Sequence, residues 1–272
     1  MSGFHLQLKF FGVRGSIPTP VPENLGFGGN TSCLEVRSGE NDLMVIDAGT
    51  GARALGRILV ERGDLDVHFW MTHFHWDHIQ GLPFFAPLFV QQAGVTFHSR
   101  KPPEMVRETL EAELRTPYFP GFEFLTRSRT FAEIDDAACK HGAMTIHSFP
   151  LNHPQGACGF RIESGGATIV HASDLEHGDP RLDGILREYA QNADVLIYDA
   201  QYSPEEYEGK KGWGHSTWLE AARVARESNV KRLILFHHDP GHDDAAIQSL
   251  VEAARRHFEN TDAAREGCTI EV

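Results

Sequence analysis

Residues 67–82, VHFWMTHFHWDHIQGL, constrain this chain more than any other part of its sequence. They begin with an apolar run of β-branched and aromatic residues that is typical of a buried strand. Four ionisable side chains follow directly, namely His73, His75, Asp77 and His78. Burying these groups without partners would cost several kcal/mol, so they are either exposed or bound to something. A divalent metal ion is the simplest partner for such a cluster.

The spacing inside the cluster indicates two binding points. His73 and His75 are two residues apart, so both side chains point the same way from an extended segment. Asp77 and His78 come after the chain starts to turn and can face a second point nearby. Imidazole and carboxylate together suit zinc, manganese or iron better than calcium or magnesium. The alternative is a solvated histidine-rich loop, which is disfavoured because the cluster follows a strand and further ligand candidates lie downstream.

The composition is that of a globular protein with an excess of acidic residues. Its 272 residues fit one large α/β domain with a sizeable core. There are 25 Lys and Arg against 38 Asp and Glu, a net charge of −13, which disfavours extended nucleic acid as a partner because phosphate tracks need clustered cations. No apolar stretch approaches the length of a membrane span, and the N-terminus lacks the pattern of a signal peptide. We expect a cytoplasmic protein with no membrane partner.

The cysteines carry no metal-site or redox spacing. Cys33, Cys139, Cys158 and Cys268 stand alone along the chain, with no C-x-x-C pair. We expect reduced thiols in a cytosolic protein and no thiolate metal site.

Strand and helix patterns alternate over most of the chain. Alternating or continuous apolar runs predict strands at 5–13, 31–37, 43–46, 64–72, 95–99, 143–149, 159–162, 168–172, 193–198 and 231–236, the last of these being the final buried strand. Helical spacing predicts helices at 52–62, 105–114, 218–228 and 243–257, the last of which closes the chain. The short turns between the first three strands predict an antiparallel start to a sheet.

Several predicted strands end in a potential ligand. Asp47 follows the strand 43–46, and it either caps the next helix or holds a metal-binding histidine from behind. His153 follows the strand at 143–149, where a third ligand would come from. Taken alone, a histidine before proline is more often a turn residue.

The second half of the chain adds two more such positions. Asp174 follows the strand 168–172, and a carboxylate with two oxygens can bridge two cations. His237 follows the strand 231–236 and has His238 as its rival. Ligand candidates gathered at the same edge of two sheets describe a two-metal pocket.

The segment THFHWDH resembles the signature of the metallo-β-lactamase-fold hydrolases, in which the H-x-H half binds one metal and the D-H half the other. The resemblance covers the whole chain and implies an α/β fold, an αββα sandwich of two mixed β-sheets flanked by helices. It implies a single domain over residues 1–272. Residues 101–140 are the least patterned part of the chain and contain an aromatic-rich loop, so we expect a lid or dimer-contact insertion there. The resemblance also implies two divalent metal ions, zinc or manganese, with iron as a further option.

The resemblance further assigns the ligands. They are His73, His75 and His153 for one metal, Asp77, His78 and His237 for the other, and Asp174 as the bridge. The family carries an aspartate at the D-x-G position of Asp47 that supports the metal site, which favours that role over the helix cap.

A second motif narrows the branch of the family. GHSTWLEAARVARESNVKRLILFHH is similar to the H-S-T helix and following strand of the 3′-tRNA-processing endonucleases and the phosphoribosyl cyclic phosphodiesterases. There the histidine donates a proton to the leaving oxygen, and an acid at the end of an earlier strand orients it. The resemblance implies that His215 is the general acid and Asp199 its partner, with Asp77 also at the catalytic centre. The endonucleases usually have Glu at the position of Asp199, and the alternative for His215 is a neighbour of a helix cap.

These features together predict a phosphodiesterase that uses a metal-activated hydroxide. The endonucleases reach tRNA with a long basic arm, and this sequence has no Gly/Pro-rich basic segment, so a cyclic nucleotide or cyclic ribose phosphate ranks above tRNA. The alternatives are a tRNA 3′-end endonuclease, a thioesterase or lactonase, and a non-catalytic metal-stabilised binding domain. Relatives are commonly homodimers, and the aromatic loop 118–124 either serves such a contact, closes the site as a lid or packs locally.

Overall fold

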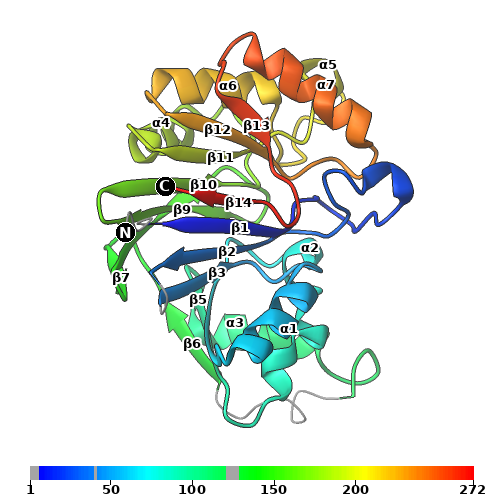
Figure 1. Cartoon of the computed structure of the whole chain (residues 1–272), viewed down its shortest axis with the longest axis vertical. Coiled ribbons are helices and arrows are strands. Elements are labelled where there is room, and N and C mark those ends of the chain that lie inside the picture. Colours follow the sequence, from blue (N-terminus) through cyan, green and yellow to red (C-terminus); the bar gives the residue numbers. More distant parts are fainter. Residues whose placement is uncertain (1–5, 40–41, 121–128) are drawn as a thin grey trace.

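A computed structural model describes residues 6–39, 42–120 and 129–272. Within these residues, two β-sheets of seven strands each lie face to face (Figure 1). Helices α1 (Ala52–Arg62) and α3 (Pro103–Glu113) cover the outer face of the first sheet. Helices α4 (Pro180–Ala190), α6 (Trp218–Glu227) and α7 (Asp244–Arg255) cover the outer face of the second. The αββα sandwich predicted from the sequence is confirmed.

The first sheet is mixed and has the strand order β14-β1-β2-β3-β4-β5-β6. Its strands are β1 (Gln7–Gly12), β2 (Cys33–Ser38), β3 (Asp42–Ile46), β4 (Asp66–Trp70), β5 (Gly94–Ser99), β6 (Arg129–Glu133) and β14 (Thr269–Glu271). β1, β2 and β3 pair antiparallel, as the short turns predict, and β3 to β6 run parallel.

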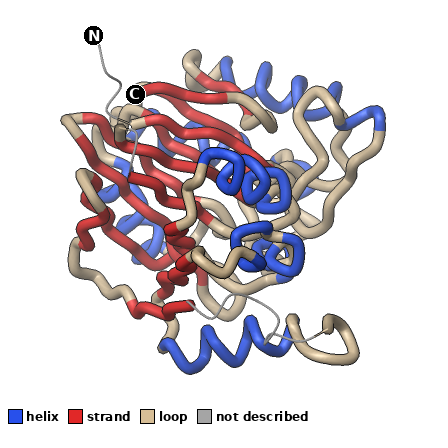
Figure 2. The backbone as a smooth tube through the Cα atoms, turned by 60° about the horizontal axis from the view of Figure 1, so that its bottom comes forward, coloured by secondary structure: helices blue, strands red, loops and turns tan. Residues whose placement is uncertain are grey.

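The second sheet is also mixed and has the order β13-β12-β11-β10-β9-β8-β7. Its strands are β7 (Cys139–His141), β8 (Met144–Leu151), β9 (Ala157–Ser164), β10 (Ala167–Ala172), β11 (Val195–Asp199), β12 (Arg232–Phe236) and β13 (Thr261–Ala263). β10 to β13 run parallel, so the carboxyl ends of β10, β11 and β12 meet at one edge. The carboxyl ends of the parallel strands β3 and β4 meet at the facing edge of the first sheet. The view in Figure 2 shows the strands of both sheets with the helices around them.

The sandwich is held by apolar side chains that alternate along the strands. One face of each strand points into the space between the sheets, where Phe10, Trp70, Phe160 and Phe236 are almost fully buried in one cluster. Fully burying a side chain of this size stabilises the fold by about 1.5–3 kcal/mol relative to leaving it exposed. The outer faces pack on the helices, and the amphipathic spacing of α1 buries Leu55 and Leu59 in this way.

The four edge strands of the two sheets were not predicted from the sequence. β6 and β7 lie at 129–133 and 139–141, and β13 and β14 follow α7. The strand 231–236 is the last buried strand, as predicted, because β13 and β14 are only partly buried. The prediction that α7 closes the chain was wrong, since these two short strands follow it. Three of these strands have only three residues, too few for an alternation pattern, and pairing with a neighbouring strand defines them. Residues 121–124 of the aromatic loop lie outside the described part of the chain. No helix in the described ranges combines the length and the apolar character needed to cross a membrane.

Candidate metal centre

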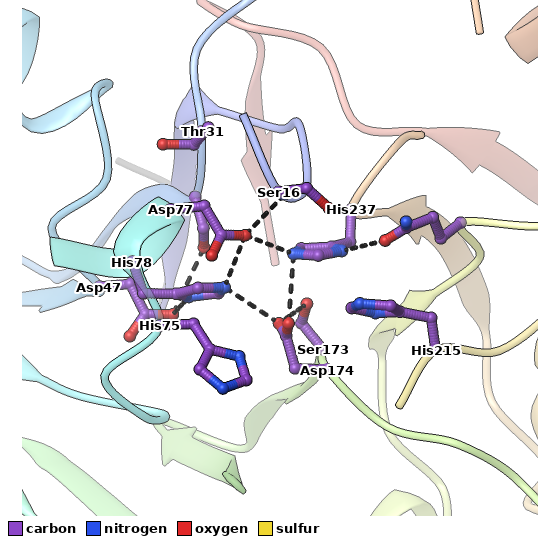
Figure 3. Close-up of polar contacts among 12 residues, drawn as sticks. Ser16, Thr31, Asp47, His75, Asp77, His78, Ser173, Asp174, His215 and His237 are labelled. Carbon is purple, nitrogen blue, oxygen red and sulfur yellow. Dashed lines mark hydrogen bonds and ion pairs between the residues drawn. The ribbon is translucent and has the colours of Figure 1, made fainter. Parts of the chain in front are cut away.

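The carboxyl ends of β4, β8, β10 and β12 bring the predicted ligands into two adjoining groups. The first group is His73, His75 and His153, and the second is Asp77, His78, Asp174 and His237; in each group the ligand atoms all lie within 4.8 Å of one another. Figure 3 shows the side chains of the second group pointing toward one another. The short helix α2 (Trp76–Ile79) follows β4 and turns Asp77 and His78 toward the second point.

Asp174 lies where the two groups meet. Its carboxylate oxygens are 3.3 Å from His78 Nε2 and 3.2 Å from His237 Nε2 in the second group (Figure 3). The same carboxylate is 3.8 Å from His73 Nε2 in the first group. This position is compatible with the predicted bridging role, which stays a prediction.

The ring nitrogens of the histidines provide a test of whether the residues fit metal ions. His73 Nε2 and His78 Nε2 are buried and have no hydrogen-bond partner among the described residues. On the opposite side of each ring, His73 Nδ1–H donates to Thr72 Oγ1 at 3.1 Å and His78 Nδ1–H to Asp47 Oδ2 at 2.7 Å. Both Nε2 atoms instead face the Asp174 carboxylate, at 3.8 Å from His73 and 3.3 Å from His78. A buried imidazole that is held through Nδ1 and turns Nε2 toward a carboxylate without a hydrogen bond is the arrangement of a metal ligand. The residues therefore fit two divalent cations.

The charges in the second group favour the same conclusion. Burial would raise the pKa of Asp77, but His78 and His237 hold it well below its usual value. Burial would lower the pKa of His237, but Asp174 first and Asp77 next raise it to about 9. Buried carboxylates here are thus balanced by protonated imidazoles, and a divalent cation would balance them directly.

Asp47 is fully buried behind the second group. Its carboxylate accepts hydrogen bonds from His78 Nδ1 at 2.7 Å, Thr72 N at 2.9 Å, Thr72 Oγ1 at 2.8 Å and Ser32 Oγ at 3.3 Å. The alternative of a helix cap is wrong, because α1 begins after Gly51 and has no side-chain cap. Through Thr72, Asp47 also reaches His73, so one carboxylate orients a histidine in each group.

Three strand ends adopt a strained backbone. Asp47, Asp174 and His237 have φ of 59°, 62° and 62°, in the left-handed region that non-glycine residues rarely enter. Such residues cost about 1–3 kcal/mol each and persist where the surrounding structure imposes them. Here the turn aims each side chain toward the centre as soon as its strand ends.

His237 rather than His238 faces the centre. His237 Nδ1–H donates to Gln201 Oε1 at 2.9 Å, which leaves Nε2 turned toward Asp77 and Asp174. His238 Nε2–H donates to the carbonyl of Ala264 at 3.0 Å, away from the centre. The backbone reversal at His237 sends the two neighbouring rings in different directions.

His215 lies across the centre and pairs with Asp199. His215 Nδ1–H donates to Asp199 Oδ2 at 2.8 Å, and Ser216 N donates to Asp199 Oδ1 at 3.2 Å. The shorter aspartate thus reaches the ring. The N-cap of α6 is Thr217, whose hydroxyl accepts from Glu220 N, so His215 is not needed as a cap. The structure brings His215 and Asp199 together as predicted, and their catalytic roles stay predictions.

One open cavity of about 510 Å³ joins these groups. Its walls are Ser16, Phe74, His75, Trp76, Asp77, Asp174 and His215. Two residues that were not predicted also reach the ligands. Ser16 N–H donates to Asp77 Oδ2 at 2.7 Å, and Gln155 Oε1 is 2.7 Å from His75 Nε2. Neither residue carries a sequence signal, since only the fold brings it to a ligand.

Comparison with known proteins now identifies the family. A family model described as the beta-lactamase superfamily domain matches residues 44–238. This chain belongs to the beta-lactamase superfamily. The matched region of this chain contains all of its predicted metal ligands, from His73 to His237.

Individual relatives agree with this assignment over almost the whole chain. The Ribonuclease Z of Archaeoglobus fulgidus is 29% identical, with 98% of this chain and 97% of the relative covered. Among solved structures, the metallo-beta-lactamase fold protein YhfI from Bacillus subtilis has a TM-score of 0.76 at 20% identity, covering 99% of this chain and 100% of that one. A diphosphatase from the PhnP family has a TM-score of 0.71 at 17% identity, covering 98% of each chain. The structural likenesses show the metallo-β-lactamase fold.

Proposed function

We propose that this chain is a dinuclear metal-dependent phosphodiesterase that hydrolyses a small phosphodiester. The observation that carries the proposal is the His215–Asp199 pair, which faces two ligand groups across one cavity. Two cations and a proton donor on one substrate-sized pocket are what in-line hydrolysis of a diester requires.

The ligand groups divide the work of holding the metals. His73, His75 and His153 would hold one cation, and Asp77, His78 and His237 the other, with Asp174 between them. When bound, zinc or manganese supplies positive charge for the phosphate oxygens and makes water acidic enough to serve as a nucleophile near neutral pH. Asp47 and Gln201 fix the rings of His78 and His237 so that their Nε2 atoms face the cations.

His215 then handles the proton at the other end of the reaction. Asp199 holds the Nδ1–H of His215, so the Nε2–H is directed into the cavity. In that position it donates its proton to the leaving alkoxide oxygen, a step worth about a hundredfold or more in rate. Asp199 accepts the Nδ1–H and so keeps the ring in place.

The substrate we infer is a cyclic nucleotide or a cyclic ribose phosphate. A cavity of about 510 Å³ is in the size range of small-molecule sites. The net charge of −13 opposes binding of a long polyanion. The alignment with the A. fulgidus Ribonuclease Z runs over 312 positions, more than the 272 residues of this chain, so that relative carries segments that this chain lacks.

The test is hydrolysis of bis(p-nitrophenyl) phosphate by protein reconstituted with zinc or manganese. The variants Asp77→Ala and His215→Ala are assayed beside it, and a panel of cyclic nucleotides follows. Turnover that depends on Asp77 supports the proposal, and His215 should matter most for substrates that leave as alkoxides. A protein that binds two metals and leaves every diester intact while cleaving a thioester or lactam would refute it.

A tRNA 3′-end endonuclease is the second candidate, and the 29% identity to a Ribonuclease Z over almost the whole chain favours it. The two candidates differ in substrate size while sharing one centre. Direct competition between a precursor tRNA and a 2′,3′-cyclic nucleotide separates them by their kcat/KM values.

We also propose that the chain works as a single domain and forms a homodimer. Tyr118, in the described part of the aromatic loop, is 79% exposed, and an exposed aromatic side chain is a common anchor at protein interfaces. Light scattering of the wild type and of Tyr118→Ser tests the dimer, and a monomeric wild type would refute it.

A further inference from the structure

Glu176 makes an unusual set of contacts beside the centre. It lies between β10 and α4, and its carboxylate accepts the N–H of Gly212 at 2.8 and 2.9 Å and the N–H of Gly214 at 3.0 Å. Tyr207 Oη donates to the same carboxylate at 2.9 Å. One side chain therefore fixes the loop at residues 207–214 at three points.

The loop held by Glu176 supports both halves of the proposed machinery. The carbonyl of Gly214 accepts the Nδ1–H of His153 at 2.8 Å, which turns His153 Nε2 toward the first ligand group. The next residue is His215. Gly214 therefore contacts the predicted metal ligand His153 through its carbonyl, and it directly precedes the predicted proton donor His215.

The two glycines make this arrangement possible. Gly212 and Gly214 both have φ of +87°, which lets their N–H groups converge on one carboxylate. A Cβ atom on Gly214 would lie 2.3 Å from His153 Nδ1, so no other residue can approach the ring this closely.

Glu176 is itself anchored to the centre. Its N–H donates to the carbonyl of Asn152 at 2.7 Å, and Asn152 Nδ2 donates to the carbonyl of Glu176 at 2.8 Å. Asn152 directly precedes His153, and Glu176 follows Asp174 by two residues. Through its backbone and its carboxylate together, Glu176 therefore connects the loops that carry His153, Asp174 and His215.

We propose that Glu176 is a positioning residue that sets His153 for the metal and His215 for proton transfer. The His215 part of this proposal rests on the proposed phosphodiesterase function, whereas the His153 part requires only that the centre binds metal. Glu176 lines neither ligand group and touches no reacting atom, so it acts through the glycine loop.

The variant Glu176→Gln isolates this role. The amide keeps the size of the side chain, but its NH₂ group faces N–H donors, so it cannot accept from Gly212, Gly214 and Tyr207 together. Glu208→Gln is the matched control, since it removes a charge from the same loop at a site that is 70% exposed and paired only with Lys211 in the described contacts. Circular dichroism and a thermal melt verify that both variants are folded.

The first readout is metal retention, measured as transfer of zinc from the loaded protein to a colorimetric chelator. The measured quantity is the chelator concentration at which half of the more weakly held zinc has been removed. We expect it to fall about tenfold in Glu176→Gln. We expect it to stay at the wild-type value in Glu208→Gln. This readout needs no substrate, so it decides the His153 part even if the protein cleaves no diester.

The second readout is the dependence on the leaving group at saturating metal. Bis(p-nitrophenyl) phosphate releases a stable phenolate that needs no proton, whereas a 2′,3′-cyclic nucleotide releases an alkoxide that does. In Glu176→Gln we expect kcat to fall about tenfold or more on the cyclic nucleotide and about twofold or less on the phenolate ester, in the same direction as His215→Ala. Equal losses on both esters would overturn the His215 part, and wild-type zinc retention would overturn the His153 part.

Discussion

The change Asp47→Asn tests the claim that one buried carboxylate orients both ligand groups. Asparagine tolerates the left-handed backbone at φ 59°, so the strand end keeps its conformation. The wild-type carboxylate accepts four hydrogen bonds, with His78 Nδ1–H, Thr72 N–H and two hydroxyl groups as donors. The asparagine amide has one acceptor oxygen, and its NH₂ group must face one of these donors whichever way it turns.

The magnitude follows from these contacts. Losing one or two hydrogen bonds to a charged acceptor costs about 2–4 kcal/mol of unfolding free energy in the metal-free protein. The affinity for metal falls about 10–100-fold, because the His78 ring, and through Thr72 the His73 ring, is no longer held for coordination.

Zinc titration against a competing chelator measures the affinity, and urea unfolding measures the stability. Asp66→Asn is the control, since it removes a charge from the 84% exposed side chain at the start of β4 and should leave both values unchanged. If Asp47→Asn binds two zinc ions with wild-type affinity, the orienting role of Asp47 is refuted.

Three further outcomes are expected. His215→Ala lowers kcat about a hundredfold on diesters with alkoxide leaving groups and changes KM little, as steady-state kinetics will measure. Phe160→Ala empties a fully buried site between the sheets and costs about 3–5 kcal/mol in urea unfolding. Burial, and then His68 and His141, lower the pKa of His98 to about 4. The unfolded chain therefore takes up a proton that the folded protein refuses, and unfolding free energy falls by about 1–2 kcal/mol between about pH 6.5 and 4 after solvent screening. His98→Gln should reduce that slope in urea unfolding, and an unchanged slope contradicts the assignment.

Most of the strands, and the residues proposed as metal ligands, could be predicted from the sequence. Buried strands are continuous apolar runs, and an abrupt change to histidine or aspartate at their ends is visible without a structure, as at His73 and Asp174. The short edge strands β13 and β14 could not be predicted in this way, because three residues are too few to show alternating apolar and polar side chains. Each is defined only by its pairing with a strand that is distant in the sequence.

Only the tertiary structure decided which groups support the ligands. Asp47 is 31 residues from His78 and Glu176 is 38 residues from Gly214, so no local pattern joins either pair. The resemblance already favoured His237 over His238, and the fold supplies the physical reason, since the left-handed turn at His237 sends only that ring toward Asp174. Metal-binding residue types are local properties of the chain, whereas the hydrogen bonds that orient them form only when the two sheets pack face to face.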